Sequence, residues 1–281
     1  MGIRVRPARL SDKEPLMSFI RGVWGGHDYI PRVWGEWFRD KANPMYVVEV
    51  DGVPVGMNRM TMLEDGSAWL EGVRVHPDHR GKGLATMLGE NSLRVARKRG
   101  AMAFKLASGS RNKRAHRQIA RLGFTEVTRF SVYEPVKGAL ARDGARRVGP
   151  EDLDEAERLM RRTKEFEIGH GVYWNNWRAA LMTPGVTRRL VEEGAVWRLG
   201  GAVAVTKPGG EGRDWEQIGF LGGEPTDAVR LARCLFGRRK GASERWAYVS
   251  QGSPLIHALR TSGFARRVSV VLFEWKAEGC A

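Results

Sequence analysis

The chain has 281 residues, enough for one large domain or two smaller ones. Hydrophobic residues make up 42% of it and charged residues 28%, so it can bury a sizeable core and is not a disordered tail. The net charge of +15 favours an anionic partner, either nucleic acid or a phosphate-rich cofactor, although much of such charge is ordinarily a solvated surface.

The sequence also excludes several classes of protein. No apolar run reaches the roughly 18–20 residues that span a bilayer, and residues 1–6 lack the apolar core of a signal peptide. The only cysteines, Cys234 and Cys280, make neither a disulfide framework nor a zinc knuckle. We therefore expect a cytoplasmic protein without a bound metal.

The first half alternates short strands with amphipathic helices. Asp51-Gly52 between two apolar runs is typical of a hairpin turn, and a glycine-rich segment at 80–83 precedes a run with one apolar helical face. This pattern predicts a mixed α/β fold. In chain order we expect a strand at 3–6, a helix capped at 11–12 and ending at Ile20, a helix at 34–38, strands at 46–50, 53–62 and 68–75, a helix closed by 97–100, a strand at 103–107, a helix at 112–122 and a strand at 125–134.

The second half repeats the pattern of the first. Residues 34–37 (Trp-Gly-Glu-Trp) recur as 174–177 (Trp-Asn-Asn-Trp), and Gly123-Phe124 recurs at the same offset as Gly263-Phe264. Shared offsets with the same order of elements indicate an internal duplication. The expected layout is a first domain at 1–137, a linker at 138–147 and a second domain at 148–281.

The most informative segment is the end of the strand at 68–75 and the turn that follows it. The turn Arg80-Gly81-Lys82-Gly83 opens a helix. Glycines let a ligand approach the backbone, and a helix N-terminus offers N–H groups and the positive end of the helix dipole. This arrangement suits a pyrophosphate, although turn glycines also occur for purely steric reasons.

The segment from Arg80 to Ala85, after a strand ending in Val-x-Pro, resembles the acyl-CoA-binding loop of the GNAT superfamily of N-acetyltransferases. Asn112 and Gly123-Phe124 follow in that family's order. The resemblance covers residues 3–135, and a faded copy covers about 146–276. It implies two tandem GNAT-like domains, each a mixed, mostly antiparallel sheet flanked by helices, with acetyl-CoA as co-substrate.

The resemblance also implies where acetyl-CoA is held. Main-chain groups of the strand would align the pantetheine arm, N–H groups of the turn would hold the pyrophosphate, and Asn112 would touch the arm. The implied cofactor-binding residues are Val73, Arg74, Val75, Arg80, Gly81, Lys82, Gly83, Leu84, Ala85 and Asn112. Four basic residues are candidate neighbours of the phosphates, although a solvated helix face explains them equally well. They are Lys82, Arg111, Lys113 and Arg117.

Glu71 is the candidate general base. Several members of the family place a carboxylate at this point of the central strand, and strand alternation predicts that Glu71 shares a face with Val73 and Val75. The competing interpretation is a glutamate that merely lies in the strand. Many members carry a tyrosine general acid on the fourth helix, but the corresponding residue here is Ile119, so the general acid is unassigned.

The acceptor side is expected between the first two helices. The segment from Gly25 to Pro31, followed by Trp34, resembles the histidine N-acetyltransferase-like branch of the family. A helix cap with core aromatics is the alternative reading. The candidate acceptor-binding residues are Trp24, His27, Asp28 and Tyr29.

The second copy carries a weaker cofactor signature. At the position of the glycine-rich turn it has Leu221-Gly222-Gly223-Glu224-Pro225, where proline removes an N–H and glutamate brings negative charge. Gln217 corresponds to Glu71. We therefore expect acetyl-CoA in the first copy alone.

Three functions remain open from the sequence. The favoured one transfers an acetyl group from acetyl-CoA to the primary amine of a small molecule such as a free amino acid. The second acetylates a protein N-terminus or lysine. The third is a non-catalytic RNA- or ribosome-binding module, which the scarcity of aromatic residues between Arg94 and Arg121 disfavours. Monomer and homodimer are both compatible with the sequence.

Overall fold

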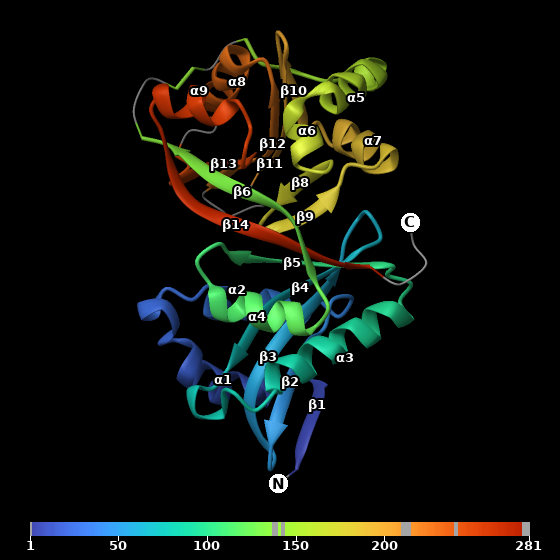
Figure 1. The fold of residues 1–281 in the computed structure, drawn as a ribbon, viewed down its shortest axis with the longest axis vertical. Coiled ribbons are helices and arrows are strands. Elements are labelled where there is room, and N and C mark those ends of the chain that lie inside the picture. The colour runs from blue at the N-terminus through green and yellow to red at the C-terminus, as the bar shows by residue number, and fades with distance from the viewer. Residues whose placement is uncertain (1, 137–139, 142–143, 209–214, 239–240, 277–281) are drawn as a thin grey trace. The chain divides into compact units, whose positions relative to one another are not determined.

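The computed structural model describes residues 2–136, 140–141, 144–208, 215–238 and 241–276. The chain divides into two compact units that interleave along the sequence (Figure 1). The first unit takes residues 1–106, 114–125 and 274–281, and the second takes residues 107–113 and 126–273. The proposed boundaries at 137 and 148 remain a prediction, and residues 138, 139, 142 and 143 of the expected linker lie outside the described residues.

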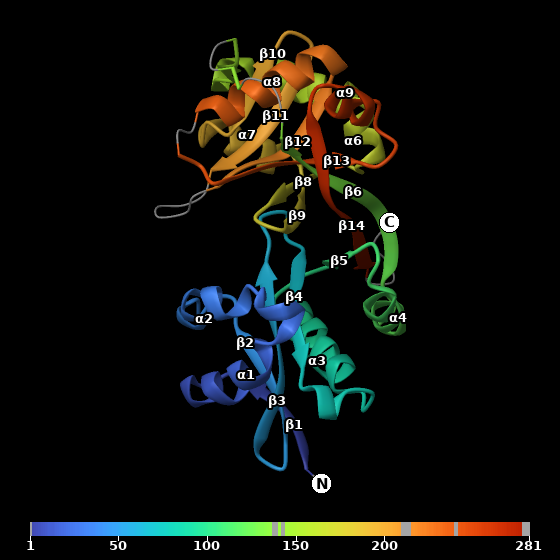
Figure 2. The same ribbon diagram turned by 90° about the vertical axis from the view of Figure 1, so that its left-hand side faces the viewer.

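The first unit is a sheet with strand order β1-β2-β3-β4-β5 and helices on both faces. Helices α1 and α2 cover one face, and α3 and α4 cover the other (Figure 2). The elements are β1 (Ile3–Pro7), α1 (Lys13–Ile20), α2 (Ile30–Arg39), β2 (Met45–Val50), β3 (Val53–Met62), β4 (Ala68–Val75), α3 (Leu84–Lys98), β5 (Ala103–Gly109) and α4 (Lys113–Arg121).

These elements confirm the expected mixed α/β fold, with one difference at α2. The helix begins at Ile30 rather than near Trp34, and Pro31 occupies its first turn. Proline is favoured there because its fixed φ suits the helix and its missing N–H would have had no partner. The Asp28 side chain accepts a hydrogen bond from the Ile30 N–H at 3.0 Å, which also marks this start.

Both faces of the sheet are buried. On the α1–α2 face, Leu16, Ile20 and Trp34 pack over Met57 of β3. On the α3 face, Leu84 and Leu88 pack over the strands. Every residue of β2 is consequently buried. This double burial holds α3 firmly beneath the sheet and fixes where its N-terminus emerges.

A buried cluster of charges ties β1 to the start of α1. Arg6 donates to both carboxylate oxygens of Asp12 at 2.8 Å and through Nε to Glu49 at 2.6 Å. Burial alone would raise the pKa of Asp12, but the hydrogen bond from Arg6 holds that pKa below its ordinary value. The hydrogen bond from Arg6 likewise lowers the pKa of Glu49.

We predict that Arg6→Met destabilises the fold by about 3 kcal/mol or more at pH 7, because it leaves the Asp12 carboxylate buried without its cation. A carboxyl whose folded-state pKa is lowered stabilises the fold above its unfolded-state pKa, and this stabilisation is lost as pH falls through the folded-state value. Urea unfolding at pH 7 and near pH 3 should therefore show the difference between variant and parent shrinking in acid. Arg4→Ala, which alters only an exposed partner of Glu49, is the control. Equal destabilisation at both pH values would contradict the prediction.

The second unit has the strand order β14-β6-β13-β12-β11-β10-β7, with a separate hairpin β8-β9. Helices α8 and α9 lie on one face and α5, α6 and α7 on the other (Figure 1). The elements are β6 (Thr125–Pro135), β7 (Arg146–Arg147), α5 (Leu153–Arg162), α6 (Lys164–Ile168), β8 (Val172–Asn175), β9 (Arg178–Leu181), α7 (Pro184–Glu192), β10 (Val196–Leu199), β11 (Ala202–Pro208), β12 (Trp215–Gly223), α8 (Pro225–Arg238), β13 (Glu244–Ser250), α9 (Leu255–Thr261) and β14 (Phe264–Lys276).

The second unit follows the order of elements of the first, with β8, β9 and α7 inserted, and the duplication itself remains a prediction. One of its sequence signals is misleading. Trp34 and Trp37 lie on helix α2, whereas Trp174 lies on strand β8 and Trp177 in the turn before β9. The match between residues 34–37 and 174–177 is therefore a coincidence of spacing. By contrast, Gly123 and Gly263 both end a helix at positive φ (+83° and +82°) and lead into a strand.

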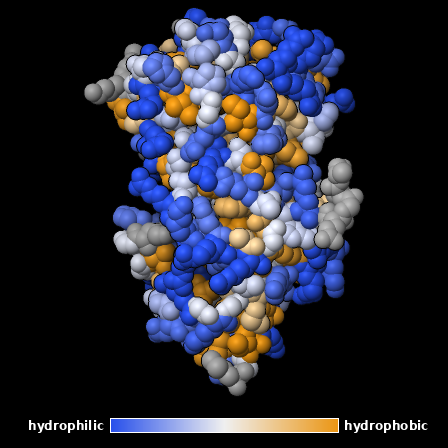
Figure 3. Space-filling view, viewed as in Figure 1, coloured by the Kyte–Doolittle hydropathy of each residue, from blue (hydrophilic) through white to orange (hydrophobic). Residues whose placement is uncertain are grey.

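The surface is consistent with the charge of the chain. Hydrophilic residues cover most of the face drawn in Figure 3, and hydrophobic residues form small scattered patches on it. Among the described helices, none combines the length and the apolar character that crossing a membrane requires.

Candidate functional site

The glycine-rich turn leads to a helix N-terminus that is open to solvent. Gly81 and Gly83 have φ of +81° and +76°, a conformation that L side chains rarely adopt, and a Cβ on either would meet nothing within 4 Å. In the part of the chain that the structure describes, the N-cap residue Gly83 gives α3 no side-chain cap and no acidic residue lies in its first turn, while Lys82 beside it is exposed. The main-chain N–H groups here form a suitable cradle for an anion.

The matching turn of the second unit is closed by its own chain. A Cβ on Gly223 would lie 2.2 Å from the carbonyl oxygen of Gly201, so backbone fills the space. The Glu224 carboxylate accepts from the Asp227 N–H at 2.9 Å, and the Asp227 carboxylate accepts from the Gly201 N–H at 2.9 Å. The Glu224 carboxylate thus caps the N-terminus of α8, and Asp227 adds a second negative charge in its first turn.

Strands β4 and β5 separate where a cofactor arm is expected. They pair in parallel only at Ala68 with Phe104 and Trp69 with Lys105 within the described chain. Farther along β4, Val73 is exposed, and its carbonyl accepts from the Arg74 guanidinium at 2.9 Å. The strand therefore presents main-chain groups to which an extended amide chain can pair.

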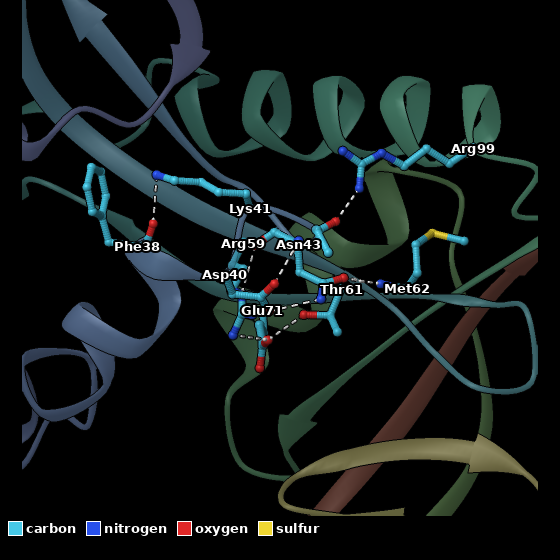
Figure 4. Close-up of polar contacts among 10 residues, drawn as sticks. Phe38, Asp40, Lys41, Asn43, Arg59, Thr61, Met62, Glu71 and Arg99 are labelled. Carbon is cyan, nitrogen blue, oxygen red and sulfur yellow. Dashed lines mark hydrogen bonds and ion pairs between the residues drawn. The ribbon is translucent and has the colours of Figure 1, made fainter.

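Glu71 lies on β4 opposite Arg59 of β3 (Figure 4). Its Oε1 accepts from the Thr61 hydroxyl at 3.0 Å and lies 3.8 Å from Nη1 of Arg59. The Arg59 side chain is 3% exposed, also binds the Asp40 carboxylate, and stacks 4.9 Å over the Trp37 ring. The carboxylate is therefore held by two side chains of β3, and one of them, Arg59, is itself fixed by Asp40 and Trp37.

The expected face of the sheet for Glu71 is wrong, because β4 has a β-bulge at Gly72. Arg59 pairs with Glu71 and Met57 with Arg74, so β4 has one more residue than β3 over this stretch. Glu71 consequently shares a face with Arg74, on the side of α2, and not with Val73 and Val75 as expected. Gly72 makes the bulge possible, because its φ is +70° and a Cβ would lie 2.8 Å from the Trp37 ring.

The candidate acceptor residues surround the start of α2. Asp28 is buried and forms an ion pair with Arg74 at 2.6 Å, while Tyr29 packs edge-on against Trp37 at 5.8 Å. His27 is exposed, and the Trp24 side chain lies outside the described residues. Asp28 thus fastens the acceptor-side loop to β4, and its role in binding the acceptor remains a prediction.

An open pocket of about 580 Å³ lies between the end of α1 and the turn after β4. The His76 ring packs edge-on against Phe19 at 5.0 Å on its wall. The pocket therefore adjoins the glycine-rich turn. Its lining residues are Phe19, Gly22, Val23, His76, Pro77 and Arg80.

Two further sequence expectations concern α4. Asn112 is exposed just before the helix, and its N–H donates to the Gly109 carbonyl at 2.9 Å, so its cofactor contact stays a prediction. Ile119 is a buried aliphatic residue, which leaves the general acid unassigned. Within the described chain, no cluster of three or more His, Cys, Asp or Glu residues is placed to hold a metal.

The sequence reasoning missed the side chains that orient the site. Arg59 and Asp40 were not singled out, and Arg74 was expected to act only through its main chain. The sequence did contain a signal for Arg59. Strands β3 and β4 are consecutive and antiparallel, so one residue of β3 must lie directly opposite Glu71. The register needed to choose that residue depends on the bulge.

Comparison with known proteins agrees with this geometry. The model of the Acetyltransferase (GNAT) family matches residues 13–124. A histidine N-acetyltransferase from Xenopus tropicalis is 31% identical over 87 residues, which is 31% of this chain and 27% of that protein. The human "Probable N-acetyltransferase 16" is 24% identical over 206 residues, covering 66% of this chain and 56% of that one.

The fold extends beyond these sequence matches. The crystal structure of a GCN5-related N-acetyltransferase from Sphaerobacter thermophilus aligns with a TM-score of 0.64 at 16% identity, covering 98% of this chain and 95% of that one. The chain spans about a quarter of the length of the histidine N-acetyltransferase that it matches. The structural likeness concerns the fold alone.

Proposed function

Because the model of the Acetyltransferase (GNAT) family matches residues 13–124, we propose that the chain transfers an acetyl group from acetyl-CoA to a primary amine. The observation that carries the proposal is the open, uncapped N-terminus of α3 behind Gly81 and Gly83. A pyrophosphate fits there because the N–H groups and the helix dipole favour negative charge, and Lys82 adds a cation. Acetyl-CoA supplies the activated acetyl thioester.

The residues of β4 perform the remaining binding steps. The main chain at Val73 and Val75 lies where β4 and β5 no longer pair, so it can align the pantetheine amides as an added strand would. The carbonyls of these two residues accept hydrogen bonds from Arg74 and Arg80. Each carbonyl has a second lone pair that can accept from a pantetheine N–H.

We assign Glu71 the role of general base. The amine nitrogen attacks the thioester carbonyl carbon, the C–S bond breaks, and CoA leaves as the thiolate. The proton lost from nitrogen passes to Glu71, directly or through a water molecule. At pH 7 an α-amino group with a pKa of about 7.7–8.0 is partly neutral, whereas a lysine amine near 10.4 needs about 4.6 kcal/mol to deprotonate. Glu71 therefore matters most for a strongly basic acceptor.

The acceptor we favour is the amine of a small molecule, with free histidine as the first candidate. Support comes from the histidine N-acetyltransferases matched in sequence and from the acceptor-side loop that Asp28 ties to β4. A protein N-terminus or lysine is the second candidate acceptor. An acetyl-CoA-dependent thiol-release assay with amino acids, polyamines, aminoglycosides and peptides separates the two.

Acetyl-CoA should raise the melting temperature of the full chain, since a ligand that binds only the folded state stabilises it by about 2.7 kcal/mol at a hundred times its Kd. S-acetyl-pantetheine, which lacks the pyrophosphate, is the matched control and should give a much smaller shift. Differential scanning fluorimetry measures both. Equal shifts, or none, would overturn the cofactor site.

A further inference from the structure

The last strand of each half of the sequence contributes residues to the unit formed mainly by the other half. Strand β6 follows α4, yet it pairs with β13 in the second unit, with Tyr133 opposite Ala247. The end of β14, from Glu274 onward, belongs to the first unit. Each unit is thus completed by a strand segment from the other half of the sequence.

Trp275, near the end of β14, contacts both α3 and β5. The Arg97 guanidinium of α3 lies 4.2 Å over its ring, and the Phe104 ring of β5 packs edge-on against it at 5.1 Å. At the end of α4, a Cβ on Gly123 would lie 3.1 Å from the indole. Next to it, the Thr125 hydroxyl donates to the Glu274 carbonyl at 3.3 Å.

These contacts reach the carboxyl end of α3, the helix that the proposed function uses for acetyl-CoA, and the carboxyl end of α4. Arg97 lies in the last turn of α3, and Gly123 follows the last turn of α4. A helix is a stiff rod, about 22 Å long for the 15 residues of α3, so a tilt at one end displaces the other. The phosphate-binding N–H groups are at that other end.

We propose that Trp275 is a positioning residue for acetyl-CoA binding, and that the degenerate second half of the chain contributes to cofactor binding through this segment. The indole wedges between α3, α4 and β5 and fixes the angle of the two helices against the sheet. This inference rests on the proposed function, because it presumes that the N-terminus of α3 holds the pyrophosphate.

The test is the acetyl-CoA Kd of full-length variants by titration calorimetry, well below their melting temperatures. Trp275→Ala should weaken binding roughly tenfold, because both the aromatic pair and the cation–π contact are lost. Trp275→Phe, which keeps an aromatic ring, should remain within about threefold of the parent. Lys276→Ala, at an exposed neighbour, should bind like the parent.

Two further variants separate positioning from general stability. Arg6→Met destabilises the same unit away from Trp275 and should leave the acetyl-CoA Kd unchanged. Arg97→Ala removes only the exposed cation and should weaken binding by about threefold, which provides a readout if Trp275→Ala does not fold. The inference is overturned if Trp275→Ala binds acetyl-CoA as tightly as the parent. If Trp275→Ala does not fold, parent-like affinity in Arg97→Ala overturns it. An equal loss of affinity in Arg6→Met also overturns it. A parent chain that does not bind acetyl-CoA would instead overturn the proposed function.

Discussion

Glu71→Gln is expected to lower turnover by about 10²-fold or more at pH 7, the usual scale for removing a general base, while leaving acetyl-CoA binding unchanged. The amide is isosteric with the carboxylate and can still accept from the Thr61 hydroxyl. It cannot take up the proton that the attacking amine releases. Steady-state kinetics with the best acceptor from the thiol-release screen, together with calorimetry for acetyl-CoA, measures both effects.

Asp40→Asn is the matched control for this variant. Glu71→Gln and Asp40→Asn each remove a carboxylate that contacts the buried Arg59 guanidinium. Only Glu71→Gln removes the proposed base. Similar losses of turnover in the two variants would indicate that Glu71 acts by holding Arg59, and the base assignment would then fall.

The pH profile of Glu71→Gln also reports the kind of acceptor. The loss of turnover in Glu71→Gln relative to the parent should become smaller as the pH approaches the pKa of the acceptor amine, because a neutral amine needs no base. For an α-amino group this occurs near pH 8, and for a lysine-type amine only above about pH 10. A deficit that stays constant from pH 7 to 10 would exclude an α-amino acceptor.

Much of the first unit could be predicted from local sequence. Asp51-Gly52 between two apolar runs marked the β2–β3 hairpin, and the glycine-rich turn marked the start of α3. The strand at 68–75 has the same bounds as β4. These features depend on residues close together in the chain, where turn chemistry and apolar periodicity act directly.

The features that could not be predicted depend on distant contacts. The bulge at Gly72 turns Glu71 toward α2, and it is visible only in the pairing of β4 with β3. Trp174 shares its spacing with Trp34 but lies in a strand that packs on β12, where its carbonyl accepts from Gln217 at 2.6 Å. The exchange of β6 and the end of β14 pairs segments far apart in sequence, and strand propensity does not determine such partners.

The contrast between the two glycine-rich turns leads to the last prediction, one acetyl-CoA per chain. Titration calorimetry should saturate near one site, because the N-terminus of α3 is open while that of α8 is capped by Glu224 and carries the negative charge of Asp227. Gly83→Asp should abolish detectable binding by placing a carboxylate against the pyrophosphate. Glu224→Gln in the second unit should leave both affinity and stoichiometry unchanged.

Gly83→Asn distinguishes charge from backbone strain in this experiment. Asparagine and aspartate both tolerate a positive φ and have nearly the same shape, and a Cβ at Gly83 meets nothing within 4 Å. The asparagine variant should therefore keep most of the affinity that the aspartate variant loses. If both variants bind equally well, Gly83 does not face the phosphates. If the parent binds two acetyl-CoA molecules, the carboxylates at α8 do not exclude a pyrophosphate, contrary to what the charge at a helix N-terminus requires.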